Sequence, residues 1–240
     1  MNERPADLPS LDPILPGQGA SDYERYLRTD ELLALQRTPE EWAHRDELLF
    51  QTVHQSSELW LKHASFEVET AATLIRERDL AGAIRLLRRA TLGLSLITDQ
   101  LGMLEQLSPW EYQDVRRILG HGSGFDSPGF NRVREVSPPL GQAFAELLRE
   151  HDLTVVELYQ RGRELEELYQ LAELLTDWDE RLTLWRVRHF KVVERIIGFD
   201  VVGTQGTPVE LLGRLINHRY YPELWHARNR LTEIAQTSPY

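Results

Sequence analysis

The sequence contains no cysteine among its 240 residues. This absence excludes disulfides, thiolate catalysis, thiolate-bound iron–sulfur clusters and covalently attached c-type haem. Any metal centre would therefore depend on His, Asp, Glu or a porphyrin. Glycine and proline are sparse, and they gather in four segments, at 1–21, 120–129, 137–141 and 198–208. We expect breaks between regular elements at these segments.

Long apolar runs and an excess of positive charge are also missing. No apolar stretch is long enough to span a bilayer, and the first 21 residues lack the apolar core of a signal peptide. The net charge of −11 argues against non-specific nucleic-acid binding, which requires a basic surface. These features predict a cytoplasmic, soluble enzyme without a nucleic-acid or membrane partner.

The remaining sequence consists of long stretches rich in Leu, Glu, Arg and Ala, with apolar residues at helical spacing and no alternating strand pattern. Three helix starts combine a hydroxyl residue, a proline and a glutamate, as in Thr38-Pro39-Glu-Glu41. The spacing predicts helices at about 22–36, 39–75, 80–106, 108–118, 140–175, 177–198 and 208–235, the second one open to a break near Asp46. We therefore predict an all-α bundle, with a flexible N-terminal segment (1–21) and one domain (22–240).

Two histidines lie in helical runs whose other inward positions are large and apolar. His54 shares a helix face with Phe50 and Glu58, four residues away on either side. His189 continues an apolar stripe that begins at Trp185. A metal ion on one ring nitrogen and a hydrogen-bond acceptor on the other would satisfy such a histidine. A core histidine with a local partner is the alternative, and each segment alone leaves both open.

Polar groups suited to a small ligand occur at two other places. Tyr112 and Arg116 are four residues apart on one helix face, where a guanidinium could grip a carboxylate. Thr204 lies in the connection 198–208, and Thr207 is expected to cap the following helix. The alternatives are a surface arginine in a solvated run and an ordinary connection.

A di-iron site of the ferritin type is a competing hypothesis, because the chain has two Glu-x-x-His pairs, Glu41/His44 and Glu223/His226. Glu41, however, is already required by the capping box that begins at Thr38. Glu223 lies at an expected helix start. The di-iron hypothesis is therefore the weaker one.

Four segments resemble motifs of the tryptophan 2,3-dioxygenase family, and they follow the family's order between about residues 22 and 220. They are Tyr23-Glu-Arg-Tyr26-Leu27, His54-Gln-Ser-Ser-Glu-Leu-Trp-Leu-Lys62, Ser123-Gly124-Phe-Asp126-Ser127 and Leu184-Trp185-Arg-Val-Arg-His189-Phe-Lys-Val-Val-Glu-Arg-Ile-Ile-Gly198. Four linked motifs are far more specific than any one of them.

The resemblance implies a bundle that encloses haem b and a homotetrameric dioxygenase of tryptophan catabolism. Such an enzyme inserts O2 across the indole 2,3 bond of L-tryptophan and forms N-formylkynurenine. His189 would ligate the iron, and His54 would lie near the substrate indole. Substrate contacts are implied for Phe50, Tyr112, Arg116 and Thr204, and, from a neighbouring subunit, for Tyr23, Tyr26 and Leu27. Haem contacts are implied for Ser123, Gly124 and Trp185.

The chain departs from the family's motifs at three places. Gly203-Thr-Gln205-Gly-Thr-Pro208 stands where the family has Gly-Thr-Gly-Gly-Ser-Ser-Gly, Asp126 replaces a glutamine, and the region 127–178 is shorter. These departures leave a haem-dependent monooxygenase of tryptophan or a substituted tryptophan as the alternative activity. A non-catalytic haem- or tryptophan-binding protein is the alternative from another class.

Overall fold

The computed structural model describes residues 11–237, which form an all-α structure whose only β feature is an isolated bridge between Val202 and Pro208. The predicted fold class is confirmed. The helices are α1 (Asp22–Leu27), α2 (Thr29–Leu33), η1 (Pro39–Glu41), α3 (Glu47–Glu77), α4 (Leu80–Asp99), α5 (Leu101–Leu104), α6 (Tyr112–Ile118), η2 (Gly124–Asp126), α7 (Pro128–Glu150), α8 (Val155–Gln160), α9 (Glu166–Ile196), α10 (Glu210–Leu215) and α11 (Pro222–Thr237).

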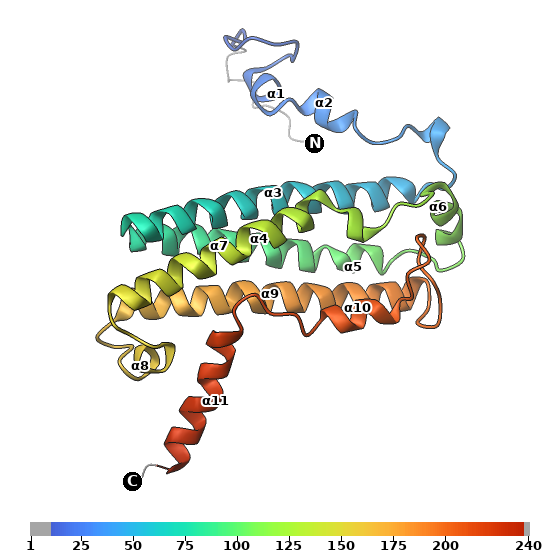
Figure 1. Ribbon diagram of the computed structural model, residues 1–240. Helices are drawn as coiled ribbons and strands as arrows, with labels where there is room; N and C mark the ends of the chain where they lie inside the picture. The colour runs from blue at the N-terminus through green and yellow to red at the C-terminus, as the bar shows by residue number, and fades with distance from the viewer. Residues whose placement is uncertain (1–10, 238–240) are drawn as a thin grey trace.

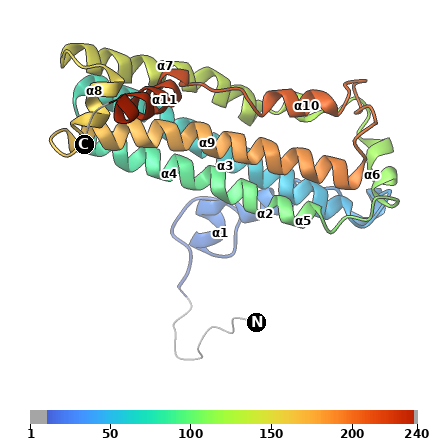
Figure 2. The same ribbon diagram turned by 90° about the horizontal axis from the view of Figure 1, so that it is seen from below.

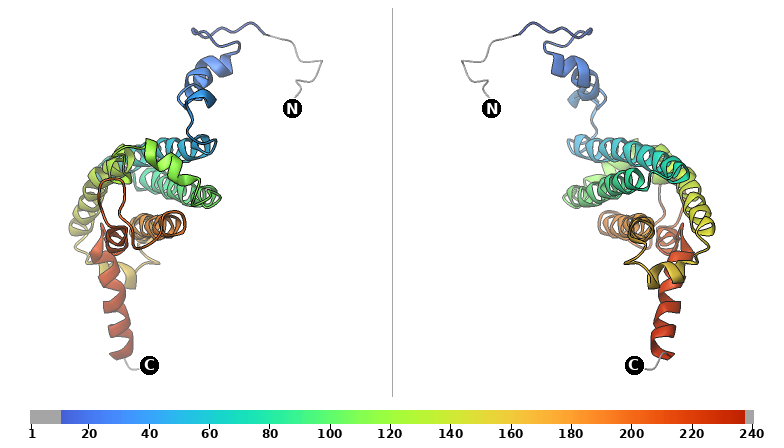
Figure 3. Two further views of the ribbon diagram at one scale, coloured as in Figure 1. Left: turned by 90° about the vertical axis from the view of Figure 1, so that its right-hand side faces the viewer. Right: turned by 90° about the vertical axis from the view of Figure 1, so that its left-hand side faces the viewer.

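Four long helices form the body of the molecule (Figure 1). Helix α3 packs against α4 on one side and α7 on the other, and α4 packs in turn against α9 (Figure 3). The inward stripe of α4 recurs every three or four residues and is fully buried; it comprises Ala83, Leu87, Ala90, Leu94 and Ile97. The alternation of small and large side chains lets the helices approach closely and fills the core.

The start of α3, α5, α6 and the end of α9 lie together at one end of the bundle (Figure 2). A second, smaller apolar cluster lies among them. Its buried members are Val53, Leu101, Leu104, Leu107, Tyr112, Val115, Val192 and Ile196. Trp185 packs against both clusters. The cluster supports the helix segments that carry His54 and His189.

Several predicted helices end or begin elsewhere. The expected break near Asp46 is present, since the short helix η1 and the long helix α3 are separate elements. The run 22–36 breaks at Arg28, which adopts a left-handed conformation with φ of 54°. Helix α10 begins at Glu210 with Val209 as its N-cap, so the prediction that Thr207 caps this helix was wrong.

The predicted break at 137–141 was also wrong, because α7 continues through Pro138 and Pro139. Tertiary contacts stabilise the backbone there: the buried Ser137 hydroxyl accepts from Trp178 Nε1 at 2.9 Å, and the Ser137 carbonyl accepts from the Tyr221 hydroxyl at 3.0 Å. The true interruption lies later, at 151–165, and α9 then runs without a break from Glu166 to Ile196.

Both ends of the described chain leave the bundle. Helices α1 and α2 lie apart from it and are joined to α3 by an extended connection, and α11 projects from the opposite side beside α8 (Figures 1 and 3). Of the segment predicted to be flexible, residues 1–10 lie outside the described residues, and Leu15 is tied to α1 through Asp22 and Arg25. No helix within 11–237 combines the length and hydrophobicity needed to cross a bilayer.

A buried carboxylate attaches α11 to the bundle. Asp179, on α9, is fully buried and accepts hydrogen bonds from Tyr220 N at 2.8 Å, Tyr221 N at 3.0 Å and Trp225 Nε1 at 3.2 Å. The carboxylate thus fixes the connection that enters α11. Removing an acceptor of this kind leaves several buried donors without a partner, which is costly.

We expect Asp179→Ala to lower the free energy of unfolding by roughly 3 kcal/mol or more, because each hydrogen bond to a buried charged group contributes about 1.5–3 kcal/mol. Urea unfolding followed by circular dichroism would measure the change. Glu180→Ala, one residue later on an exposed position of the same helix, is the matched control and should change stability by less than about 0.5 kcal/mol. Equal effects from the two variants would contradict the anchoring role.

Candidate active site

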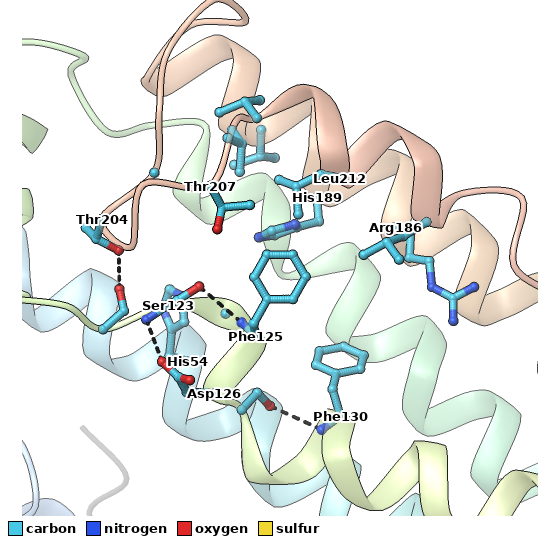
Figure 4. Close-up of a pocket in the computed structure, with 18 of the residues that line it drawn as sticks. His54, Ser123, Phe125, Asp126, Phe130, Arg186, His189, Thr204, Thr207 and Leu212 are labelled. Atoms are coloured by element: carbon cyan, nitrogen blue, oxygen red, sulfur yellow. Dashed lines mark hydrogen bonds between the residues drawn. The ribbon is translucent and has the colours of Figure 1, made fainter.

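A cavity of about 670 Å³ opens at the end of the bundle that holds the smaller apolar cluster. It is bounded by α3, α6, the start of α7, α9 and α10, together with the connections 119–127 and 203–209 (Figure 4). Its volume falls within the range of pockets that hold cofactors and drug-sized ligands. Both histidines singled out in the sequence line it.

His189 projects into this cavity from α9 (Figure 4). Trp185, one turn earlier, stacks on its ring at 4.7 Å between centroids and 9° between planes, and Phe130 contacts Trp185 at 4.1 Å. Burial, with a smaller contribution from His54, lowers the pKa of His189 to about 4. The ring is therefore neutral at neutral pH, and it makes no hydrogen bond within the described part of the chain. A neutral ring nitrogen is what a metal ligand requires.

His54 faces the same cavity from α3. Its Nδ1 donates to the Phe50 carbonyl at 2.7 Å, and the Phe50 ring lies 4.0 Å from the imidazole. Burial lowers the pKa of His54, while the Phe50 carbonyl and the Glu58 carboxylate act in the opposite direction. With the proton assigned to Nδ1 by this hydrogen bond, Nε2 is left as an acceptor. His54 can therefore accept a hydrogen bond from a ligand N–H.

Tyr112 and Arg116 project from α6 beside Phe50. The Tyr112 ring lies 5.9 Å from that of Phe50 and is almost completely buried, which raises the pKa of its hydroxyl. Arg116 Nη2 donates to the Val202 carbonyl across the cavity mouth. A guanidinium carries five N–H donors, so most of them are left for a ligand carboxylate. Thr204 lies in the same loop as Val202 and also lines the cavity. The structure thus brings together four of the residues predicted to contact the substrate, namely Phe50, Tyr112, Arg116 and Thr204.

Two short segments meet over the cavity. The Thr204 hydroxyl donates to the Gly122 carbonyl, and Ser123 and Gly124 follow directly on the same segment (Figure 4). The Ser123 hydroxyl accepts from Phe125 N at 3.3 Å, which begins the short helix η2. All three of the positions implied for haem contact, Ser123, Gly124 and Trp185, line the cavity.

Several lining residues were missed by the sequence reasoning. Glu58 accepts from the Ser127 hydroxyl and, at 2.8 Å, from Gly129 N, and so joins α3 to the start of α7. Gly129 must be glycine, because a Cβ there would lie 2.7 Å from Glu58 and Leu61. The spacing of Glu58 from His54 was the available signal. Other lining residues not foreseen include Phe125, Phe130, Arg134, Arg186 and a third histidine, His218.

Three predicted site residues lie outside the cavity of this chain. Tyr23, Tyr26 and Leu27 belong to α1, with exposed fractions of 68%, 78% and 45%, and none of them lines the cavity. The N-terminal motif of the described chain therefore does not line the cavity of the same chain.

The di-iron hypothesis fails on geometry. Glu41 accepts from Thr38 N, as the capping box requires, and His44 lies instead near Asp46 and Glu111. His226 belongs to α11, which lies beside α8 and far from α6 in both perpendicular views (Figures 1 and 2). Within 11–237, the only cluster of three or more potential His or carboxylate ligands is His44, Asp46 and Glu111, and it excludes Glu41, Glu223 and His226.

Comparison with known proteins identifies the family. The model of the tryptophan 2,3-dioxygenase family matches residues 15–143. A tryptophan 2,3-dioxygenase of Bacillus anthracis is 33% identical over 87% of this chain and 92% of its own length, and one of Caulobacter vibrioides is 33% identical over 87% and 98%. A Bacillus thuringiensis relative of the same name is 32% identical over 87% and 92%. The chain belongs to the tryptophan 2,3-dioxygenase family.

The family assignment made from four short motifs is therefore confirmed. The alignments extend over 92% and 98% of the length of the Bacillus anthracis and Caulobacter vibrioides relatives. The match includes the segments that place His54 and Arg116 around the cavity.

Proposed function

We propose that this chain is a haem-dependent tryptophan 2,3-dioxygenase, which inserts O2 across the indole 2,3 bond of L-tryptophan to give N-formylkynurenine. The observation that carries the proposal is the pairing of two histidines on one cavity: His189 with an unpartnered, neutral ring, and His54 with a free acceptor nitrogen beside Arg116. The family membership supports the same activity.

The residues around His189 fit a haem b. The walls there are apolar and aromatic, with Trp185 and Phe130 beside the imidazole. Trp185 Nε1 is buried without a hydrogen-bond partner among the described residues, as expected of a donor that faces a ligand. Arg134 and Arg186 also line the cavity and offer guanidinium groups to carboxylates such as the propionates of a haem. In this proposal His189 holds the iron, and Ser123, Gly124 and Trp185 contact the macrocycle.

The haem, when bound, would supply the activation of O2, which is chemistry that no side chain here can perform. The chain supplies orientation. Arg116, with the neutral Tyr112 hydroxyl beside it, holds the substrate carboxylate, and His54 Nε2 accepts from the indole N–H. The Phe50 ring packs against the indole. Because both ends of the amino acid are held, the indole is already oriented for reaction, which lowers the entropic part of the barrier.

The loop 198–209 completes the site from above. The Thr204 hydroxyl has committed its proton to the Gly122 carbonyl, so only its lone pairs are left to face a ligand. A hydroxyl in this state accepts from the substrate ammonium and cannot donate to it. The apolar walls around His189 limit the access of water to the reacting centre.

The decisive experiment is a single incubation of haem-loaded, reduced protein with L-tryptophan and 18O2, followed by mass spectrometry of the product. We expect a product that carries two labelled oxygen atoms. One labelled atom would replace the proposal with the monooxygenase alternative. If the haem-loaded protein binds tryptophan and the tryptophan is recovered unchanged, the alternative of a non-catalytic binding protein would replace the proposal.

We further propose that the enzyme is a homo-oligomer in which α1 of one subunit covers the cavity of another. In this chain α1 stands away from the bundle, and Tyr23, Tyr26 and Leu27 are exposed together on it (Figure 3). Exposed apolar side chains grouped in this way favour contact with another subunit. Multi-angle light scattering of the full chain should give the mass of a dimer or tetramer. A monomer at micromolar concentration would contradict this part of the proposal. The cytoplasmic location stays a prediction of the sequence.

A further inference from the structure

Two segments that are far apart in the sequence line the mouth of the cavity and contact each other there. One is the segment 120–127 between α6 and α7, and the other is the loop 198–209 between α9 and α10. Two of the contacts that hold the loop in place end on backbone carbonyls: Arg116 donates to Val202, and Thr204 donates to Gly122. Backbone acceptors are available in any sequence, so these two contacts do not depend on the choice of side chain at the acceptor.

The third contact joins two side chains. Gln205 Nε2 donates to Asp126 Oδ2 at 2.6 Å, across 79 positions of sequence. The same carboxylate oxygen accepts from Ser123 N at 3.2 Å, which fixes the Asp126 side chain on its own segment (Figure 4). A hydrogen bond to an ionised acceptor is stronger than one between neutral groups. Asp126 and Gln205 are also two of the positions at which this chain departs from the motifs that it resembles.

The position of this hydrogen bond matters for Thr204, the residue next to Gln205. The Thr204 hydroxyl presents its lone pairs to the cavity only while the loop keeps it against Gly122. Gly203 and Gly206 flank the pair of residues, and Gly206 adopts φ of 75°. The backbone hydrogen bonds of this turn, from Gly203 N to the Thr207 carbonyl at 2.8 Å and from Gly206 N to the Gly203 carbonyl at 3.0 Å, lie within the loop and do not attach it to the segment 120–127. The hydrogen bond from the Gln205 side chain to Asp126 therefore restrains the loop directly beside Thr204.

We propose that Asp126 and Gln205 are positioning residues, which together latch the loop 198–209 over the cavity and hold the Thr204 hydroxyl in its acceptor orientation. Both side chains are exposed, so the pair contributes little to global stability and acts on the open–closed equilibrium of the loop. The role in turnover rests on the proposed function, whereas the latch itself does not.

The test uses the haem-loaded full chain and a reciprocal pair of variants. Gln205→Glu places a second carboxylate against Asp126 and should open the loop. The double variant Asp126→Asn with Gln205→Glu restores a donor and an acceptor, because an asparagine amide can donate to the new carboxylate while its oxygen accepts from Ser123 N. Gln236→Glu, on an exposed position of α11, is the matched control for the added charge.

We expect amide hydrogen exchange within 200–207 to be about five-fold faster in Gln205→Glu than in the unmodified protein, and to return to within about two-fold in the double variant. The KM for tryptophan should rise by about five-fold in Gln205→Glu with kcat nearly unchanged, and the double variant should reverse that rise. Gln236→Glu should change neither measurement.

Unchanged exchange in Gln205→Glu, or a double variant that exchanges as fast as the single one, would overturn the latch. Exchange needs no turnover, so this result is independent of the activity. If the exchange rates follow the prediction but neither the unmodified protein nor any variant consumes tryptophan, the latch is supported and the proposed function is rejected.

Discussion

Replacing His189 with alanine is expected to abolish stable haem binding. The variant removes a cavity histidine whose ring has no hydrogen-bond partner in the described structure and whose depressed pKa, about 4, keeps it neutral. Loss of residues that merely support a metal ligand costs 10- to 100-fold in metal affinity, so loss of the ligand itself should cost at least about 100-fold. Haemin titration followed at the Soret band would measure it, and tryptophan turnover should fall below detection.

His54→Ala is the matched control, because it removes an imidazole from the opposite wall of the same cavity. This variant should retain the Soret band and lose turnover. Added imidazole should restore the Soret band in His189→Ala, since it fits the space that the side chain leaves. A His189→Ala protein with a normal ferrous spectrum would remove His189 from the ligand role, and loss of haem from His54→Ala alone would exchange the two assignments.

The second large effect is expected at Arg116. Arg116→Ala should weaken the binding of L-tryptophan by roughly 10- to 100-fold while leaving the haem spectrum intact, because a hydrogen bond between charged groups contributes about 1.5–3 kcal/mol. Spectral titration of the ferric protein with tryptophan would give the dissociation constant. Unchanged tryptophan affinity would reject the carboxylate assignment.

Arg116 also donates to the Val202 carbonyl, so its removal could weaken binding through the loop instead. Tryptamine separates the two effects, since it has the indole and the ammonium of tryptophan and no carboxylate. If Arg116 binds the carboxylate, Arg116→Ala should change tryptamine affinity by less than about two-fold. An equal loss for both ligands would show that the loop contact dominates.

The helical class and most helix positions were predictable because apolar residues repeat at helical spacing over long stretches. The α4 stripe from Ala83 to Ile97 is an example, since its periodicity alone identifies the buried face. The failures occurred where tertiary contacts override local preference. Pro138 and Pro139 are strong helix breakers in isolation, yet α7 passes through them at a point where Trp178 and Tyr221 donate hydrogen bonds to Ser137.

The sequence by itself determined the all-α class, the family and the identity of the side chains capable of ligation, since motif order and helical periodicity are properties of the chain alone. Only the tertiary structure decided which of them share a cavity. It places His54, Arg116 and His189 around one space and sends His226 elsewhere, and it brings Asp126 within hydrogen-bonding distance of Gln205. Such juxtapositions arise from the packing of helices far apart in sequence, and no local pattern encodes them.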